Sequence, residues 1–338
     1  MRCVNVLITG IGSAGVGEQI LKSLNLSELN LNLVGTDVTI NCFNKDSVDC
    51  FEILPYAHEE TFINEVKNIV QKHNIQIIFP GSDPEMKVLC SHKSDFENIY
   101  IVANDLSLIN TCLNKNSTYE LLKEALIPLP KYMKINLIID CRKIDFFPVV
   151  LKPNTGSGGS SHIYVAYNYE ELLFFTQYML NRNIDIIAQE YIEYDDNEYT
   201  IGVSNDLDGL SLGTIILKRS LTSAISVNKK MRFENTNVII SSGISQGVFL
   251  HDDHLKIQAE RIATILKSKG PLNIQGRVSN GQLMLMEINP RLSGTTFLRA
   301  LVGYNEPENI IKRVVFNELP EYEYEDGMVL RSLIEKRI

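Results

Sequence analysis

Short apolar runs alternate with stretches of helical spacing over the first hundred residues, and this alternation constrains the fold more than any other feature. β-branched residues are frequent in the runs, as in strands that are buried on both faces. Strands joined by helices predict a parallel sheet with helices packed on its faces. The expected strands span residues 5–9, 31–35, 75–79 and 100–102, and the expected helices span residues 17–24 and 61–73.

The pattern changes after residue 110. Ser117 and Glu120 have the spacing of a capping box and predict the start of a helix. Asp208-Gly209 and Asn280-Gly281 are typical of hairpin turns and predict antiparallel strands. The predicted fold class is therefore α/β, with an α+β arrangement in the C-terminal part. Further expected elements are a helix over residues 119–125, strands over 147–152, 163–166 and 184–189, and a helix over 254–267.

Charge and cysteine content argue against several classes of function. The 32 basic and 41 acidic residues give a net charge of −9, which disfavours a nucleic-acid or anionic-membrane surface. Residues 1–9 lack the length and cleavage pattern of a secretion signal, and no apolar run reaches the roughly 20 residues that span a bilayer. Six cysteines without a CxxC pair fit neither a disulfide framework nor a zinc site, so we expect a cytoplasmic protein.

A Gly-rich turn follows the first expected strand. Gly10, Gly12 and Gly15 form a GxGxxG pattern, and Asp37 lies 22 residues after Gly15 at the end of the second strand. This arrangement matches a dinucleotide-binding fingerprint, in which glycines let the backbone approach a pyrophosphate. The turn leaves an NAD-dependent dehydrogenase open as an alternative function, beside a plain strand-to-helix turn that binds nothing.

A lysine and a second Gly-rich loop occur in the middle of the chain. Lys152 ends an apolar strand, and Gly156, Gly158 and Gly159 follow it. Lysine supplies a positive charge, and glycines let backbone N–H groups surround phosphate oxygens. No Gly-Lys-Ser/Thr ends the loop, so it is not a Walker P-loop. It predicts a phosphate-covering loop, against the alternative of a solvated hairpin loop.

The segment Glu287-Ile-Asn289-Pro-Arg291 carries the sharpest chemical signal. Residues two apart on a strand face the same side, so Glu287 and Asn289 present two oxygen ligands together. Magnesium takes few protein oxygens and leaves its other positions to phosphate and water. Arg291, just past the strand, is placed to neutralise charge on a transferring phosphoryl group. The segment predicts a magnesium site for phosphoryl transfer, against the alternative of a polar strand end.

In their order and spacing these motifs resemble those of the ATP-grasp superfamily, most closely the synthetase halves of the carbamoyl-phosphate synthase large subunit and stand-alone ligases like them. The resemblance covers nearly the whole chain. It implies a Rossmann-like pre-ATP-grasp domain over residues 1–109, followed by a two-lobed ATP-grasp domain. The small lobe, with its phosphate-covering loop, is expected over residues 110–188, and the large lobe, with the metal site, over residues 189–338. The implied cofactors are ATP and Mg²⁺, with Mn²⁺ as an alternative metal.

The resemblance also implies roles for individual residues. The implied phosphate contacts are Lys115, Lys152, Thr155, Gly156, Ser157, Gly158 and Gly159. The implied contacts to adenine are Gln189, Glu190 and Ile192, and the implied ribose contact is Glu198. The implied metal ligands are Gln275, Glu287 and Asn289, and the implied catalytic residue is the phosphate-stabilising Arg291.

Two departures and one conflict of register limit what the resemblance implies. Leu292-Ser293-Gly294 replaces a further arginine of the synthetase halves, which argues against bicarbonate-dependent chemistry, and the chain corresponds to one half-unit. A carboxylate–amine ligase therefore fits better than a complete carbamoyl-phosphate synthase.

A strict two-residue turn at Asn280-Gly281 pairs Gln275 with Met286 and turns it away from Glu287. Gln275 joins the metal site only if a longer loop or a bulge shifts the register.

The predicted function is an ATP-dependent, ADP-forming ligase that activates a small-molecule carboxylate as an acyl phosphate and joins it to an amine. A kinase that releases a phosphorylated product and the NAD-dependent dehydrogenase stay open as alternatives. No nucleic-acid or membrane partner is expected, and the sequence leaves a homodimer open. The expected substrate contacts are Ser82, Asp83, Arg219 and Ser242.

Overall fold

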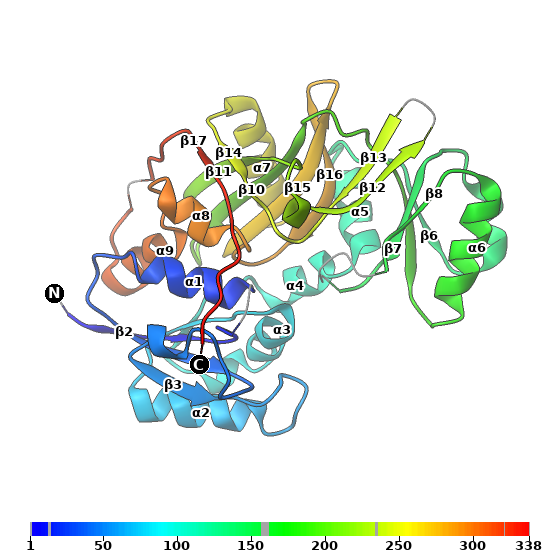
Figure 1. Ribbon diagram of the computed structural model, residues 1–338. Coiled ribbons are helices and arrows are strands. Elements are labelled where there is room, and N and C mark those ends of the chain that lie inside the picture. The colour runs from blue at the N-terminus through cyan, green and yellow to red at the C-terminus, as the bar shows by residue number, and fades with distance from the viewer. Residues whose placement is uncertain (1, 13–14, 157–161, 234–235, 321, 338) are drawn as a thin grey trace.

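The computed structural model describes residues 2–12, 15–156, 162–233, 236–320 and 322–337. The chain forms a parallel sheet near its N-terminus, followed by a small and a large antiparallel sheet (Figure 1). In the described ranges no helix has the length and apolar character needed to cross a membrane. Short 3₁₀ helices lie at Lys45–Ser47, Lys93–Asp95, Ile138–Lys143 and Ala224–Ser226.

The N-terminal elements are β1 (Val4–Ile8), α1 (Val16–Leu24), β2 (Leu31–Asp37), β3 (Cys50–Ile53), α2 (Phe62–His73), β4 (Ile77–Phe79), α3 (Asp83–Ser91), β5 (Tyr100–Ile101) and α4 (Leu106–Cys112). Their strands run parallel in the order β3-β2-β1-β4-β5. Successive strand residues point to opposite faces. Val6 and Ile8 therefore pack with Ile20 of α1, whereas Leu7 packs with Val66 of α2. Both faces of this sheet are buried, which explains the near-continuous apolar runs.

The small sheet consists of β6 (Tyr132–Ile135), β7 (Val149–Pro153), β8 (Tyr164–Ala166) and β9 (Ile186–Glu190), with α6 (Tyr169–Leu180) against it. The strand order is β6-β9-β7-β8, and the pairs are antiparallel. Val149 and Leu151 pack with Leu172 and Met179 of α6. Because side chains alternate along β7, Lys152 lies on the opposite face of the sheet, away from α6.

The large sheet has the order β16-β15-β10-β11-β14-β17. Its strands are β10 (Glu198–Asn205), β11 (Ser211–Arg219), β14 (Gly247–Phe249), β15 (Pro271–Ser279), β16 (Gln282–Asn289) and β17 (Gly327–Val329), with a separate hairpin of β12 (Val227–Phe233) and β13 (Thr236–Ser241). The helices that accompany it are α5 (Lys115–Glu124), α7 (Asp253–Ile265), α8 (Thr296–Leu301) and α9 (Glu306–Phe316). Ile201 and Ile274 pack with Tyr119 of α5 and Ile262 of α7. On the other face, Ile215 of β11 packs with Leu298 of α8, and the polar residues of β15 and β16 are left for the site.

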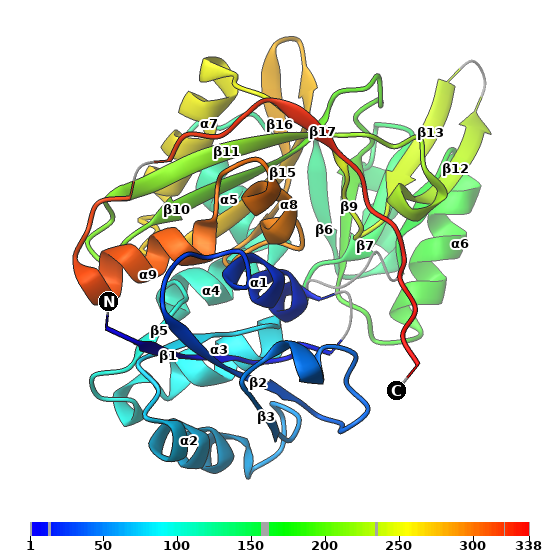
Figure 2. The same ribbon diagram turned by 60° about the vertical axis from the view of Figure 1, so that its left-hand side comes forward.

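Side-chain hydrogen bonds join the C-terminal part of the chain to the N-terminal domain, among them those of Asn104 and Asn305. Asn104 Nδ2 donates hydrogen bonds to the carbonyl oxygens of Pro271 at 2.9 Å and Pro290 at 3.2 Å. Asn305 Nδ2 donates to the carbonyl oxygen of Ser23 at 2.8 Å, where α9 lies alongside α1 (Figure 2). These contacts hold the end of β16 close to the carboxyl ends of the parallel strands.

The predicted α/β class, with an α+β C-terminal part, is confirmed, but three local expectations need correction. β3 was not predicted from the sequence. The capping residue of α5 is Asn114, whose side chain accepts the Ser117 N–H, so the helix starts at Lys115 and not after Ser117. The boundary predicted between residues 188 and 189 falls inside β9, which stays paired in the small sheet to Glu190.

Candidate functional site

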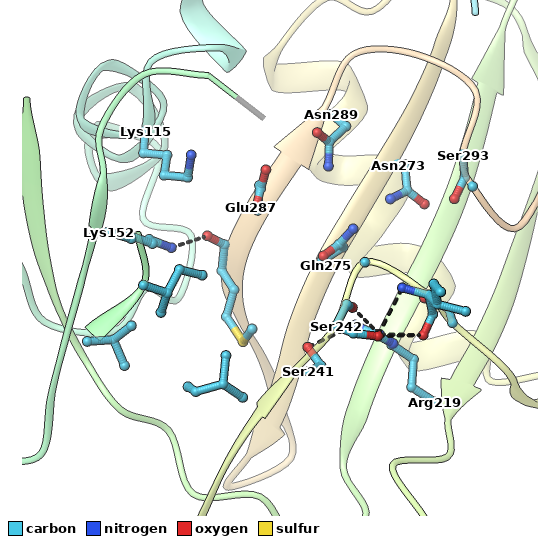
Figure 3. Close-up of a pocket in the computed structure, with 18 of the residues that line it drawn as sticks. Lys115, Lys152, Arg219, Ser241, Ser242, Asn273, Gln275, Glu287, Asn289 and Ser293 are labelled. Atoms are coloured by element: carbon cyan, nitrogen blue, oxygen red, sulfur yellow. Dashed lines mark hydrogen bonds between the residues drawn. The ribbon is translucent and has the colours of Figure 1, made fainter. Parts of the chain in front are cut away.

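A cavity of about 820 Å³ lies between the polar face of the large sheet and the small sheet. Both lobes and the N-terminal domain line it, the latter through Gly15 and Val16. Figure 3 shows Lys115 and Lys152 approaching Glu287 from one side, with Gln275 and Asn289 on the floor formed by β15 and β16. The structure therefore brings together residues that the sequence places as much as 174 positions apart, from Lys115 to Asn289.

The β15–β16 hairpin decides the register that the sequence left open. Asn280 and Gly281 form a strict two-residue turn with φ values of 51° and 75°, and Ser279 pairs with Gln282. A bulge then shifts the register between Gln275 and Gly276, so that Gln275 pairs with Glu287. A bulge sets two residues of one strand against one of the other and turns the following side chains over. Of the two arrangements that bring Gln275 to Glu287, the bulge is the one that occurs.

The shifted register places the three expected metal ligands along one wall of the cavity. Gln275, Glu287 and Asn289 all line it, and Asn289 is 4% exposed. The set offers one carboxylate and two amide oxygens, which suits Mg²⁺ because this ion binds hard oxygen ligands and keeps waters and phosphate oxygens. The described residues contain no group of three or more His, Cys, Asp or Glu side chains placed to hold a metal.

Two lysines face these oxygen ligands from the side of the small sheet. Lys115 Nζ donates to the Gly156 carbonyl oxygen at 2.9 Å, and Lys152 Nζ donates to the Met286 carbonyl oxygen at 3.1 Å. Burial and the nearby Lys115 together lower the pKa of Lys152 to about 7, although Glu287 opposes both effects. Among the described residues its hydrogen-bond acceptors are neutral oxygens, so the buried ammonium group would gain from a phosphate.

The expected adenine contacts line the cavity where β9 ends. Gln189 Oε1 accepts a hydrogen bond from the Tyr119 hydroxyl at 2.9 Å. The Glu190 N–H donates to the Lys131 carbonyl oxygen at 2.8 Å. No described residue accepts a hydrogen bond from the Ile192 N–H, and Ile192 lines the cavity. A ring nitrogen of a bound base is a suitable acceptor for that group.

The position of Glu198 corrects the expected ribose contact. Glu198 is 1% exposed and forms ion pairs with Arg219 at 2.7 Å and Arg277 at 2.8 Å. Burial alone would raise its pKa, but the two guanidinium groups hold the pKa below its usual range. Because both carboxylate oxygens are already engaged, Glu198 holds the two arginines rather than presenting a free acceptor. The arginines, not Glu198, line the cavity.

The four residues expected to contact substrate fall into two groups. Arg219 donates to the Ser242 carbonyl oxygen at 2.8 Å, and both residues line the cavity. Asp83 instead accepts a hydrogen bond from Arg291 Nε at 2.6 Å. Ser82 caps α3 and donates to Glu85 at 2.6 Å. Neither Ser82 nor Asp83 lines the cavity, so their expected substrate contact is corrected to a cap and to a support for Arg291.

The phosphate-covering loop is described only in part. Thr155 and Gly156 line the cavity, and the Gly156 N–H donates to the Leu113 carbonyl oxygen at 3.2 Å. The expected contacts Ser157, Gly158 and Gly159 lie outside the described residues.

The N-terminal Gly-rich turn is filled by carboxylates of its own domain. Asp37 Oδ2 accepts the Gly12 N–H at 2.7 Å, and a Cβ added to Gly12 would lie 2.4 Å from that oxygen. A Cβ added to Gly10, where φ is +60°, would lie 3.2 Å from a carboxylate oxygen of Glu85. A pyrophosphate at this turn would meet two carboxylates, which argues against the dinucleotide interpretation.

Two cavity residues of β15 were missed from the sequence. Asn273 and Arg277 lie on either side of the predicted Gln275, and both line the cavity. Their period of two was a usable signal, because alternate strand residues share a face. Tyr119 does not line the cavity, but its hydroxyl accepts a hydrogen bond from Lys152 at 3.3 Å, and the sequence gave no signal of this contact between α5 and β7.

Comparison with known proteins identifies the class of fold. A family described as ATP-grasp in the biosynthetic pathway with Ter operon matches residues 214–333, and a PylC-like N-terminal domain matches residues 6–103. The L-amino acid ligase from Bacillus licheniformis superposes with a TM-score of 0.66 at 16% identity, covering 93% of this chain and 75% of that one. The ADP complex of N5-carboxyaminoimidazole synthetase from Staphylococcus aureus gives a TM-score of 0.66 at 14% identity, covering 96% and 80%. The chain thus contains an ATP-grasp domain, as predicted, behind a PylC-like N-terminal domain.

A sequence relative adds homology to this likeness of fold. The arginine-specific large chain of carbamoyl phosphate synthase from Bacillus subtilis is 23% identical over 301 residues, which cover 86% of this chain and 28% of the relative. The protein is therefore homologous to the carbamoyl phosphate synthase large chain. It spans 21–28% of the length of the curated relatives that it matches.

Proposed function

We propose that this protein is an ATP-dependent, ADP-forming ligase that activates a small-molecule carboxylate as an acyl phosphate and joins it to an amine. The observation that carries the proposal is that three oxygen-bearing side chains and two lysines lie on opposite sides of one cavity. Gln275, Glu287 and Asn289 share a wall through the bulged register, and Lys115 and Lys152 approach from the opposite lobe. Oxygen ligands opposite buried lysines suit a metal-bound polyphosphate.

Each part of the cavity has a task in this proposal. The segment from Gln189 to Ile192 holds the adenine, the two lysines hold phosphate oxygens, and Gln275, Glu287 and Asn289 hold Mg²⁺. When bound there, Mg²⁺ neutralises charge on the β- and γ-phosphates. Thr155 and Gly156 begin a cover that excludes water from the reacting groups. We propose a cytoplasmic enzyme whose partners are small carboxylates and amines.

The chemistry consists of two displacements. A carboxylate oxygen of the substrate attacks the γ-phosphorus, the bond from phosphorus to the ADP oxygen breaks, and an acyl phosphate forms. The amine then attacks the acyl carbon, phosphate leaves with the electron pair of its bond to that carbon, and the amine loses a proton. Arg291, held by Asp83, neutralises charge on the transferred group. Positioning and charge do most of this work, so few acid–base groups are needed.

The proposal is tested by screening amino acids and other small carboxylates for ADP release, with and without amines. We expect one carboxylate to support slow ADP release and the correct amine to raise it at least about tenfold, or 1.4 kcal/mol of barrier. Hydroxylamine should trap a hydroxamate when no amine is present. The E287A variant, run in parallel, separates this activity from contaminating ATPases.

Two other results would select the alternatives. A stable phosphorylated product that accumulates one-for-one with ADP, whatever the amine, would establish a kinase. In a thermal-shift assay we expect Mg·ATP to bind at micromolar affinity, about −8 kcal/mol, and NADH to have no effect. Stabilisation by NADH without stabilisation by ATP would contradict the ligase and favour the dehydrogenase.

A further inference from the structure

Asn273 lines the cavity but has no task in the mechanism above. It lies on β15 directly opposite Asn289 and is 2% exposed. Residues two apart on a strand share a face, so its amide shares the cavity face with Gln275. Figure 3 shows the Asn273 side chain beside Asn289, on the far side of Glu287 from the lysines. It is therefore placed near the reacting end of the cavity rather than near the lysines.

Two donors determine which end of the Asn273 amide faces the cavity. Its Oδ1 accepts hydrogen bonds from Thr200 Oγ1 at 2.8 Å and from Arg299 Nη2 at 2.9 Å. A guanidinium group can only donate, so the atom beside Arg299 must be the oxygen. The Nδ2 group is left toward the cavity, and no described residue accepts a hydrogen bond from it.

A buried ion pair holds Arg299 in this position. Arg299 is 1% exposed and donates to Glu306 Oε2 at 2.6 Å, and Glu306 also accepts the Ser204 hydroxyl at 2.5 Å. Gly202 pairs with Asn273 across β10 and β15, and a Cβ added there would lie 2.1 Å from Arg299 Nη1. The strand therefore carries a glycine where the guanidinium passes. Together these contacts hold Arg299 where it orients the side-chain amide of Asn273.

We propose that Asn273 is a further catalytic residue whose Nδ2–H donates a hydrogen bond to the substrate carboxylate oxygen that is not phosphorylated. This inference rests on the proposed function. Negative charge grows on that oxygen when the amine attacks the acyl carbon, because the carbonyl electron pair moves onto it. It also grows when the phosphorus–oxygen bond of the acyl phosphate breaks, because the released pair is shared by both carboxylate oxygens. A donor oriented in advance stabilises such charge without reorganisation.

The charges around the reacting centre favour a neutral donor at this position. Arg291 and the two lysines already supply cationic groups to the cavity, and a neutral amide adds a hydrogen bond without repelling the metal. Thr200 and Arg299 do not need to touch the substrate. They act as positioning residues, because they hold Oδ1 and so determine where Nδ2 points.

Acetyl phosphate, the simplest acyl phosphate of this kind, tests the proposal without knowledge of the natural substrate. With Mg·ADP the reverse half-reaction breaks the bond between phosphorus and the acyl oxygen, joins phosphorus to a β-phosphate oxygen of ADP, and releases acetate and ATP. ATP formation is measured by luciferase for the wild type, N273A, N273D and T200V. N205D is the matched control, because Asn205 is a buried asparagine of β10 whose Nδ2 donates to the Ser268 carbonyl oxygen, outside the cavity.

We expect N273D to lower kcat about a hundredfold, the range for one oxyanion donor, with the KM for Mg·ADP unchanged within about twofold. The carboxylate of N273D is isosteric and can pair with Arg299, so this variant guards against a loss of folding in N273A. T200V should give a smaller loss of kcat, again without a change in KM, and N205D should behave as the wild type.

The outcomes separate the two proposals. Wild-type ATP formation together with an N273D kcat within twofold of the wild type would overturn the assignment of Asn273 and leave the ligase standing. A matching rise in KM for Mg·ADP would also overturn it, since that result would place the amide on the nucleotide. A wild type that makes no ATP from acetyl phosphate would overturn acyl-phosphate chemistry, and the role of Asn273 with it.

Discussion

At the end of the N-terminal sheet, the carboxylate of Asp37 accepts hydrogen bonds from backbone N–H groups. In the large lobe, by contrast, the carboxylate of Glu287 faces two lysines across a cavity (Figure 3). Asp37 accepts the N–H groups of Gly12 and Val38, so both of its oxygens are engaged. Burial raises the pKa of Glu85 beside Gly10, although hydrogen bonds from Ser82 and Thr9 oppose the shift. The Gly12 N–H of the N-terminal turn is thus satisfied by a carboxylate of its own domain.

Across the cavity, by contrast, Glu287 of the large lobe and Lys152 of the small sheet have no charged hydrogen-bond partner among the described residues. No described residue donates a hydrogen bond to the Glu287 carboxylate, and Lys152 has only neutral oxygen acceptors. A Gly-rich turn indicates anion binding only when its N–H groups are free, and a carboxylate indicates a metal only when it lacks donors of its own. Both regions contain carboxylates, and they differ in whether those carboxylates already have hydrogen-bond donors.

The strongest test of this comparison removes the cavity carboxylate. E287A should lower ADP formation by a thousandfold or more, on the order of 4 kcal/mol of barrier, because the metal loses its charged ligand. Circular dichroism and thermal melting should be unchanged. E170A, at an exposed site at the start of α6, is the control. Near-normal turnover of E287A at saturating Mg²⁺ would contradict the assignment of Glu287 as a metal ligand.

A second test concerns the contact between the two regions. D83N keeps the shape of the side chain but removes the charge that holds Arg291 Nε at 2.6 Å. We expect kcat to fall about tenfold, or 1.4 kcal/mol, with little change in the KM for ATP, and D83E to recover part of the loss. A rise in KM for the carboxylate with kcat unchanged would instead return Asp83 to the role of a substrate contact.

The lysine side of the cavity predicts a dependence on pH. The pKa of Lys152 is lowered to about 7 by burial and by Lys115, against Glu287. Phosphates favour the charged form, so Mg·ADP binding should raise this pKa and take up a proton above pH 7. Affinity should then fall as pH rises from 7 to 9, by up to about tenfold per pH unit.

Titration calorimetry in buffers of different ionisation enthalpy measures that proton uptake directly. K152R should abolish it, because the guanidinium group stays charged over this range. An affinity that is constant from pH 7 to 9 in the wild type would show that Lys152 stays charged or lies away from the phosphates.

The smallest effect is expected at the N-terminal turn. D37N removes one acceptor from the Gly12 and Val38 N–H groups and should cost about 1–2 kcal/mol of unfolding free energy. The affinity for Mg·ADP should not change, and no affinity for NADH should appear. Urea denaturation and thermal shift check both results, with the exposed D145N as control. A loss of nucleotide affinity in D37N would show that the two regions share a ligand.

Much of the site could be predicted because its residues lie on strands, where spacing determines the face. Glu287 and Asn289 required only the period of two, and Lys152 only its place at the end of an apolar strand. Gln275 could not be placed, because a bulge with Met286 as the extra residue of β16 reverses the face without changing the turn. Glu198 was assigned to ribose because nothing in its own segment reveals that Arg219 and Arg277 enclose it.

The sequence by itself determined the parallel N-terminal sheet, the antiparallel character of the C-terminal part and the shared face of Glu287 and Asn289, since these depend on local periodicity and turn chemistry. Only the tertiary structure decided which polar groups are left unsatisfied. Asp37 accepts a hydrogen bond from Gly12, Asp83 accepts one from Arg291, and the Asn273 oxygen accepts one from Arg299. Each of these partners is distant in sequence, and a hydrogen bond between distant residues depends on packing, which local periodicity does not encode.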